Sequence, residues 1–120
     1  MAHIAPSNAV VTLVNVFRLH NPSDQQRLVD LLVEATETTM RRQPGYVSAS
    51  IHKSLDGTHV VNYAQWRSRV DFEAMLTNPP ASEHMGRAAR LAEFEPHLYD
   101  VIYSDSVEPS LGSTSDPTVS

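Results

Sequence analysis

The sequence contains no cysteine, and that absence removes several kinds of chemistry. Disulfides, thiolate nucleophiles and thiolate metal ligands all require a cysteine sulfur. Glycine is scarce as well, with 4 residues in the chain, and no glycine-rich loop of the phosphate-binding type is present. The motif GxSxG and metal-binding pairs such as HExxH are also missing. The sequence therefore contains no motif for a metal, a bound nucleotide or a serine-hydrolase nucleophile.

Positive charge is also in short supply, since 9 Lys and Arg stand against 14 Asp and Glu and the formal net charge is −5. Recognition of nucleic-acid phosphates needs a basic patch, so we expect no nucleic-acid partner. No apolar run approaches the roughly 20 residues that a membrane-spanning helix needs, so we expect no membrane partner. The first residues have no basic stretch followed by an apolar run, so we expect no signal peptide and a cytoplasmic protein.

The 120 residues suit one domain with its own core, and a hydrophobic content of 41% is typical of a globular protein. The C-terminal stretch is rich in Ser, Pro, Asp and Thr and has too few apolar groups to offset the entropy of ordering it. We therefore predict a flexible N-terminal tail over residues 1–8, a folded domain over 9–105 and a disordered C-terminal tail over 106–120.

Alternating, β-branched and aromatic residues predict strands over residues 10–19, 46–54, 58–66 and 97–105. The Asp56-Gly57 pair is a strong turn signal, so the second and third strands should form a hairpin.

Helical spacing predicts three helices between these strands, with Ser23, Ser68 and Ser82 as N-caps and the third helix continuing to Phe94. The resulting order, β-α-β-β-α-α-β, fits an α+β fold of the ferredoxin-like, split βαβ type. In that fold an antiparallel sheet is covered by helices on one face.

The other face of this sheet would carry His59, Val61, Tyr63 and Gln65 on the third strand, together with apolar residues of the last strand. This mixture is too apolar to remain exposed on several strands at once. We therefore expect a second copy of the sheet to cover it, which gives a two-fold homodimer.

Asn62 and Trp66 lie four residues apart on the predicted third strand, so their side chains point to the same, helix-covered face. A buried amide costs about 1–3 kcal/mol unless it is hydrogen-bonded. Two interpretations remain open at this point. In one, Asn62 bonds a backbone group and Trp66 fills the core. In the other, the small Ala64 between them leaves a cavity where the amide and the indole N–H orient a planar polar ligand.

The hairpin PGYVSASIHKSLDGTHVVNYAQW resembles that of the antibiotic biosynthesis monooxygenase family. It is most similar to the cofactor-independent, quinone-forming members of aromatic polyketide pathways, of which the actinorhodin-pathway enzyme is the type example. The resemblance covers about residues 10–104 and implies a dimeric α+β barrel. It further implies that a cavity between sheet and helices binds a phenolic or anthrone-type polyketide, which O2 oxidises without flavin, haem or metal.

By this resemblance, Asn62 and Trp66 contact the oxygens of the substrate and stabilise the phenolate or enolate that gives an electron to O2. An arginine of the last helix corresponds to Arg87, or to Arg90 in a shifted register, and would stabilise the anion. Substrate contacts are expected at Ile51, Tyr63, Phe72, Met75 and Met85. The type enzyme has tyrosines considered for proton transfer at the positions of Ile51 and Phe72, neither of which can transfer a proton.

Two other functions remain open. Haem-degrading monooxygenases of the same fold use an asparagine of the first strand, a tryptophan that ends the third and a helical histidine. Asn15, Trp66 and His84 have loosely similar places. The replaced tyrosines also leave open a non-oxidative polyketide-binding, cyclase or dimerisation protein. His52 should point away from the helices and have a structural role.

Overall fold

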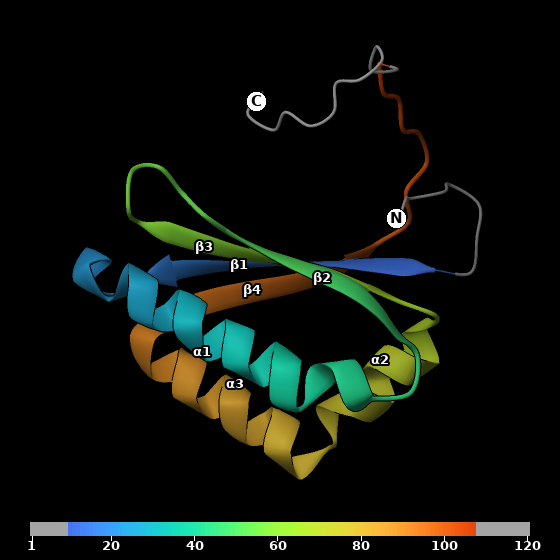
Figure 1. Cartoon of the computed structure of the whole chain (residues 1–120), viewed down its shortest axis with the longest axis horizontal. Helices are drawn as coiled ribbons and strands as arrows, with labels where there is room; N and C mark the ends of the chain where they lie inside the picture. Colours follow the sequence, from blue (N-terminus) through green and yellow to red (C-terminus); the bar gives the residue numbers. More distant parts are fainter. Residues whose placement is uncertain (1–9, 108–120) are drawn as a thin grey trace.

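The computed structural model describes residues 10–107, so the predicted tails 1–8 and 106–120 lie outside it except for residues 106 and 107 (Figure 1). The strands are β1 (Val11–Leu19), β2 (Tyr46–Lys53), β3 (His59–Trp66) and β4 (Ala92–Tyr99). The helices are α1 (Gln25–Thr38), α2 (Arg69–Leu76) and α3 (Pro79–Leu91), with short 3-10 turns over Pro22–Asp24 and Met40–Arg42.

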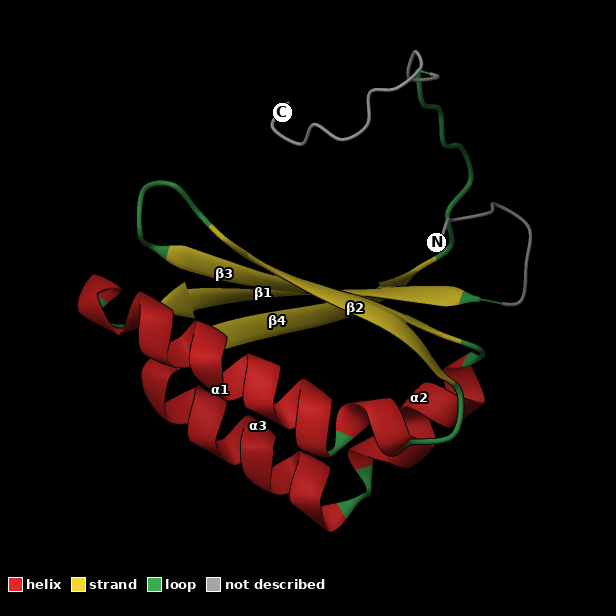
Figure 2. Ribbon diagram, in the orientation of Figure 1, coloured by secondary structure: helices red, strands yellow, loops and turns green. Residues whose placement is uncertain are grey.

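The strands form one antiparallel sheet in the order β2-β3-β1-β4, so β1 and β3 are central and β2 and β4 are edges. Figure 2 shows the three helices (red) on the same side of the sheet (yellow). Each helical crossover joins two strands that are separated by a third. This arrangement confirms the predicted ferredoxin-like α+β fold.

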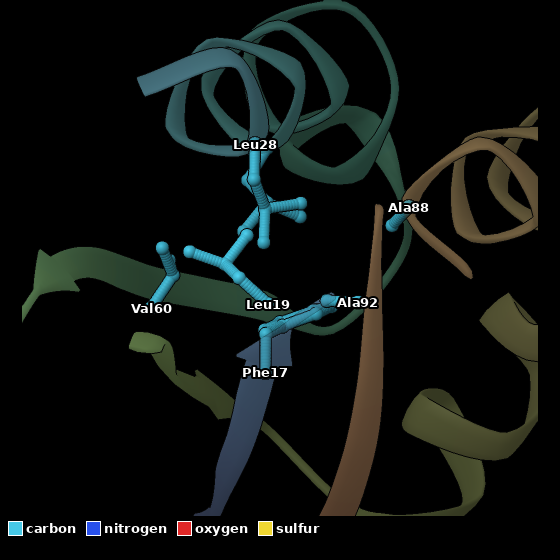
Figure 3. Packing of buried hydrophobic residues seen from close by; sticks show 7 residues of the cluster. Phe17, Leu19, Leu28, Val60, Ala88 and Ala92 are labelled. Carbon is cyan, nitrogen blue, oxygen red and sulfur yellow. The ribbon is translucent and has the colours of Figure 1, made fainter. Parts of the chain in front are cut away.

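One part of the core lies between the sheet and helices α1 and α3 (Figure 3). Phe17 and Val60 come from the two central strands and are completely buried, as is Leu28 of α1. Burial of such a side chain stabilises the fold by about 1.5–3 kcal/mol. Ala88 of α3 and Ala92 of β4 are buried on the same side, and their small size lets α3 lie close to the sheet.

The predicted N-cap at Ser23 is wrong. Asn21 Oδ1 accepts a hydrogen bond from the Ser23 N–H (3.0 Å) and so begins the 3-10 turn that leads into α1. The N-cap at Ser68 is confirmed, because its side chain accepts a hydrogen bond from the Asp71 N–H at the start of α2.

The predicted N-cap at Ser82 is also wrong, because the N-cap of α3 is Asn78, four residues earlier, and the helix begins at Pro79. Asn78 Oδ1 accepts a hydrogen bond from the Ala81 N–H (3.1 Å). Pro79 follows it at the first helical position, where a missing N–H has no cost. The Asn-Pro-Pro sequence that ends α2 therefore also starts the next helix.

The strand predicted over 97–105 lies earlier in the chain, and the predicted helix to Phe94 is correspondingly too long. Ala92 already pairs with Leu19, and β4 ends at Tyr99. Pro96 has no backbone N–H and cannot donate a hydrogen bond to a neighbouring strand. A sheet tolerates a proline in an edge strand, and β4 is an edge strand whose one neighbour is β1. The polar sequence of β4 has weak strand propensity, so its pairing with β1 decides its conformation.

The hairpin between β2 and β3 confirms the turn prediction. Gly57 has a φ of 83°, a left-handed conformation that favours glycine. Asp56 Oδ1 accepts hydrogen bonds from the Thr58 N–H (3.0 Å), the Thr58 hydroxyl (2.7 Å) and the Ser54 hydroxyl (2.8 Å). These bonds, those of Thr58 first, lower the pKa of Asp56 to about 2, which shows how strongly the turn favours its carboxylate form.

β2 contains an irregularity at Val47. Tyr46 pairs with Trp66 of β3, whereas Ser48 pairs with the preceding residue, Gln65, so Val47 is an extra residue and forms a β-bulge. The bulge shifts the alternation of side chains along β2. Tyr46 therefore lies on the helix-covered side of the sheet, where it packs with Trp66.

The open face of the sheet, opposite the helices, carries a mixture of apolar and polar side chains. Val16 and Tyr99 are exposed to 38% and 49%, and Tyr63 is half-buried. Gln65 and Thr12 are buried and form a hydrogen bond of 3.3 Å. Among the described residues, no helix has both the length and the apolar character needed to cross a membrane.

Candidate active site

β3 places an amide and an indole on the wall of a cavity. Asn62, Ala64 and Trp66 alternate along the strand and all line this cavity, as their even spacing predicts. Trp66 is 2% exposed. Its ring makes edge-to-face contacts with Tyr46 (centroids 5.7 Å apart) and Phe72 (6.0 Å), and these contacts fix the plane of the indole.

The cavity has a volume of about 340 Å³ and lies between the sheet and the helices. This volume is within the range of about 300–1,000 Å³ that is usual for small-molecule sites. Its walls are mainly apolar: Leu13, Met40, Ala49, Ala64, Phe72, Met75, Leu76, Met85, Phe94, Pro96 and Leu98. Ala49 of β2 pairs with Ala64 of β3, so two methyl groups form the floor of the cavity. The predicted cavity beside Ala64 is confirmed.

Two asparagines lie side by side on this wall. Asn15 of β1 is directly opposite Asn62 of β3, and both line the cavity. The Oδ1 atoms of both and the Nε1 atom of Trp66 are buried without a hydrogen-bond partner among the described residues. Each such atom costs about 1–3 kcal/mol in a core. The Asn62 carbonyl is thus not satisfied by the backbone, and the three atoms together indicate a ligand site.

Three more of the predicted substrate contacts also line the cavity. Phe72 and Met75 come from α2 and are buried, and Met85 comes from α3. α2 follows β3 after a short turn, so it holds Phe72 against Trp66 at the end of that strand. The structure therefore brings these three residues together with Asn62 and Trp66.

The remaining predicted site residues lie elsewhere. Ile51 lines an adjacent groove between α1 and β2. Tyr63 alternates with Asn62 and so lies on the open face of the sheet. Arg87 and Arg90 are exposed on α3, outside the cavity lining. Arg87 is two positions after Met85, a rotation of about 200° around the helix, so it faces away from the cavity.

His84 does not line the cavity either. Its Nε2 lies 3.0 Å from the Thr39 hydroxyl, and its Nδ1 is buried without a partner among the described residues. The three residues of the haem hypothesis are therefore not brought together, because Asn15 and Trp66 line the cavity and His84 does not. Within residues 10–107, no group of three or more His, Asp and Glu side chains is arranged to hold a metal ion.

Five polar residues of the cavity lining were not among the predicted contacts of a polyketide: Asn15, Thr36, Tyr46, Ser82 and His97. For Asn15 the sequence holds a signal, since it is a polar residue on the same strand face as Leu13 and Phe17. For Tyr46 it holds none, because regular alternation along β2 would turn this side chain to the open face. The bulge at Val47 reverses that direction.

Residues 10–90 match the family profile described as antibiotic biosynthesis monooxygenase. The chain belongs to this family. The match covers most of the described residues: β1, α1, the β2–β3 hairpin, α2 and most of α3. The predicted membership of the antibiotic biosynthesis monooxygenase family is confirmed.

Relatives of known function support the same conclusion. The chain is 45% identical over 104 residues to tetracenomycin-F1 monooxygenase of Streptomyces glaucescens, a match covering 87% of this chain and 92% of that protein. It resembles the monooxygenase ActVA-Orf6 of Streptomyces coelicolor, solved in complex with nanaomycin D, with a TM-score of 0.71 and 28% identity over 85% of this chain and 94% of that one.

A third relative shares the fold at lower identity. SnoaB of Streptomyces nogalater, a cofactor-independent oxygenase, matches with a TM-score of 0.68 and 23% identity over 88% of this chain and 100% of that one. The chain was predicted to be an enzyme and a monooxygenase. Both predictions are confirmed, because the chain belongs to the antibiotic biosynthesis monooxygenase family and its relatives include two named monooxygenases.

Proposed function

We propose that the protein is a cofactor-independent monooxygenase that oxidises a phenolic or anthrone-type aromatic polyketide intermediate to a quinone with O2. The cytoplasm is its predicted location. The observation that carries this proposal is the set of three buried polar atoms without a partner among the described residues on a mainly apolar cavity wall: Asn15 Oδ1, Asn62 Oδ1 and Trp66 Nε1. The tetracenomycin-F1 monooxygenase, at 45% identity, supports a substrate of the polyketide class.

These side chains suit a ligand that is both flat and oxygenated. The indole N–H of Trp66 donates a hydrogen bond, and each asparagine amide can donate through its NH2 group and accept through its carbonyl. A phenol that loses its proton needs donors at the oxygen where negative charge develops. In an apolar cavity such donors are worth more than in water, because no solvent competes with them.

The chemistry needs no external reductant. In an anthrone the reacting carbon is a CH2 group between two aromatic rings, and its oxidation follows CH2 + O2 → C=O + H2O. The substrate first loses a proton and becomes an electron-rich phenolate, which reduces O2. One oxygen atom becomes the new carbonyl and the other leaves as water, and all four electrons come from the substrate. The protein contributes by binding the phenolate form and by holding it in a mainly apolar cavity.

The test is consumption of O2 by the purified protein with an anthrone and a metal chelator, measured against the spontaneous rate. We expect Asn62→Ala and Trp66→Phe each to lower the enzymatic rate about 10- to 100-fold, because each removes a hydrogen bond to a developing charge. Val70→Ala, on an exposed part of α2, is the matched control and should leave the rate unchanged.

A wild-type protein that does not exceed the spontaneous rate would exclude the oxidative function for this substrate class. Loss of activity on treatment with the chelator would contradict the cofactor-independent mechanism. A Soret band on addition of haemin that His84→Ala abolishes would instead favour the haem-binding alternative.

A further inference from the structure

Tyr46 carries a phenol on the cavity wall that the reaction proposed above does not use. It is the first residue of β2, it lines the cavity, and its ring meets the Trp66 ring at an interplanar angle of 87°. Among the described residues that line the cavity, Tyr46 has the only phenolic hydroxyl. A group of this kind can donate a hydrogen bond to an oxygen of a ligand.

The backbone of β2 is irregular at the point that aims this side chain. Because Val47 is an extra residue, Tyr46 pairs with Trp66 and shares the helix-covered face with Ala49, although the two are three residues apart. A regular strand would place Tyr46 with Ser48 on the open face. Bulges are frequent beside active sites, where they redirect one side chain in this way.

The Tyr46 hydroxyl is protonated and available. Burial raises the pKa of the phenol above its ordinary value, and the positive charge of Arg41 opposes this only in part. The hydroxyl is therefore a donor at neutral pH. Burial and Arg41 are the two causes of this shift, and neither is a hydrogen bond to the hydroxyl from residues 10–107.

The position of Tyr46 is complementary to that of the two asparagines. Tyr46 pairs with Trp66, whereas Asn15 pairs with Asn62, four residues away along β3. Four residues of a strand span about 13 Å. The alanine floor lies between these two groups, and an apolar, flat molecule that rests on it has polar groups of the protein at both ends.

We propose that Tyr46 is a second substrate contact, whose hydroxyl donates a hydrogen bond to an oxygen at the end of the polycyclic substrate away from Asn15 and Asn62. This inference rests on the proposed function. It adds to it that the preferred substrate is a fused-ring phenol with oxygen substituents at both ends of its long axis.

The test is binding of 2,6-dihydroxyanthraquinone, a probe that is not oxidised and has a hydroxyl at each end of its long axis, followed by its absorbance change. Tyr46→Phe keeps the ring and its contact with Trp66 and removes only the hydroxyl. We expect the dissociation constant of the probe to rise about 5- to 10-fold, as for the loss of one hydrogen bond. Tyr99→Phe, which removes a hydroxyl from the open face, is the matched control and should leave the constant unchanged. Anthracene, which has no oxygen, should bind to both Tyr46 forms equally.

The outcomes separate this inference from the proposed function. Equal probe binding by the wild type and Tyr46→Phe, together with weaker binding by Asn62→Ala, would overturn the role of Tyr46 and leave the proposed function intact. A clear effect of Tyr46→Phe in a protein that consumes no O2 would support the contact and reject the oxidation. Absence of saturable probe binding by the wild type would overturn both.

Discussion

At the scale of single residues, Asn62 and Gln65 are two polar side chains of the same strand in opposite situations. Gln65 is buried on the open face and forms a hydrogen bond of 3.3 Å with Thr12. Asn62 lines the cavity with its Oδ1 buried and without a partner among the described residues. A buried polar group without a partner lowers stability, whereas one with a partner contributes to it. The two positions therefore respond differently to an apolar replacement.

We predict that Asn62→Leu, which is nearly isosteric, leaves the free energy of unfolding unchanged or raises it by about 1 kcal/mol while oxygenase activity is lost. The matched variant Gln65→Met should lower the free energy of unfolding by about 1 kcal/mol, because the Thr12 hydroxyl loses its hydrogen-bond partner. Urea denaturation of the two variants gives the comparison. A clear destabilisation by Asn62→Leu would mean that the amide has a structural role.

Also at this scale, Ile51 and Phe72 occupy the two positions at which, by the resemblance, the type enzyme has tyrosines. Phe72 lies against Trp66 at 6.0 Å and keeps the aromatic contact without a hydroxyl. Ile51 lines the groove beside the cavity. Tyr46 lines both spaces, so a phenol is present near both positions although it comes from another part of β2.

At the scale of elements, Asn21 caps the 3-10 turn that precedes α1 and Asn78 caps α3, in place of the predicted serine caps. Both choices obey the same physical rule, because each side chain offers an oxygen to a free backbone N–H. The Asn-Pro sequence is decisive before α3, since Pro79 suits the first helical position and Asn78 precedes it. The third helix is therefore a full turn longer at its start than Ser82 implied, and this turn packs the buried Ala81 beside the cavity.

We predict that Asn78→Ala lowers the free energy of unfolding by about 1 kcal/mol, because the Ala81 N–H loses its acceptor. Ser82→Ala is the matched control, and it should change stability by less than about 0.5 kcal/mol since no cap is lost. Thermal or urea unfolding measures both. The reverse order of effects would restore Ser82 as the cap.

At the scale of the whole molecule, the open face of the sheet is the feature that the single chain leaves unexplained. Figure 2 shows the helices on one side of the sheet. Apolar residues such as Val16 and Tyr99 remain exposed on the other side. We propose a homodimer in which two such faces meet, because a two-fold contact lets one patch cover itself.

We predict that Val16→Glu, at the centre of this face, converts the dimer into a monomer, because it would bury a charge without a partner in the interface. Val70→Glu, on the exposed surface of α2, is the matched control and should leave the dimer intact. Light scattering coupled to gel filtration measures the mass of each. A wild-type protein that is monomeric at all concentrations would exclude this assembly.

Much of the fold follows from local rules that the sequence contains by itself. The period of two along β3 determined that Asn62, Ala64 and Trp66 share a face, and the Asp56-Gly57 turn determined the hairpin. These signals are reliable because side-chain alternation and turn conformation depend on neighbouring residues alone. The hairpin sequence also determined the family, whose profile matches residues 10–90.

Other features were decided only by the tertiary structure. β4 forms around a proline and two glutamates because β1 offers it an edge to pair with, a contact between residues some 75 positions apart, such as Arg18 with Glu93. The bulge at Val47 is set by the pairing of β2 with β3, and it alone turns Tyr46 into the cavity. The side-by-side placement of Asn15 and Asn62 likewise needs the register of β1 against β3. The physical reason is the same in each case, because strand pairing joins distant parts of the chain and overrides local preference.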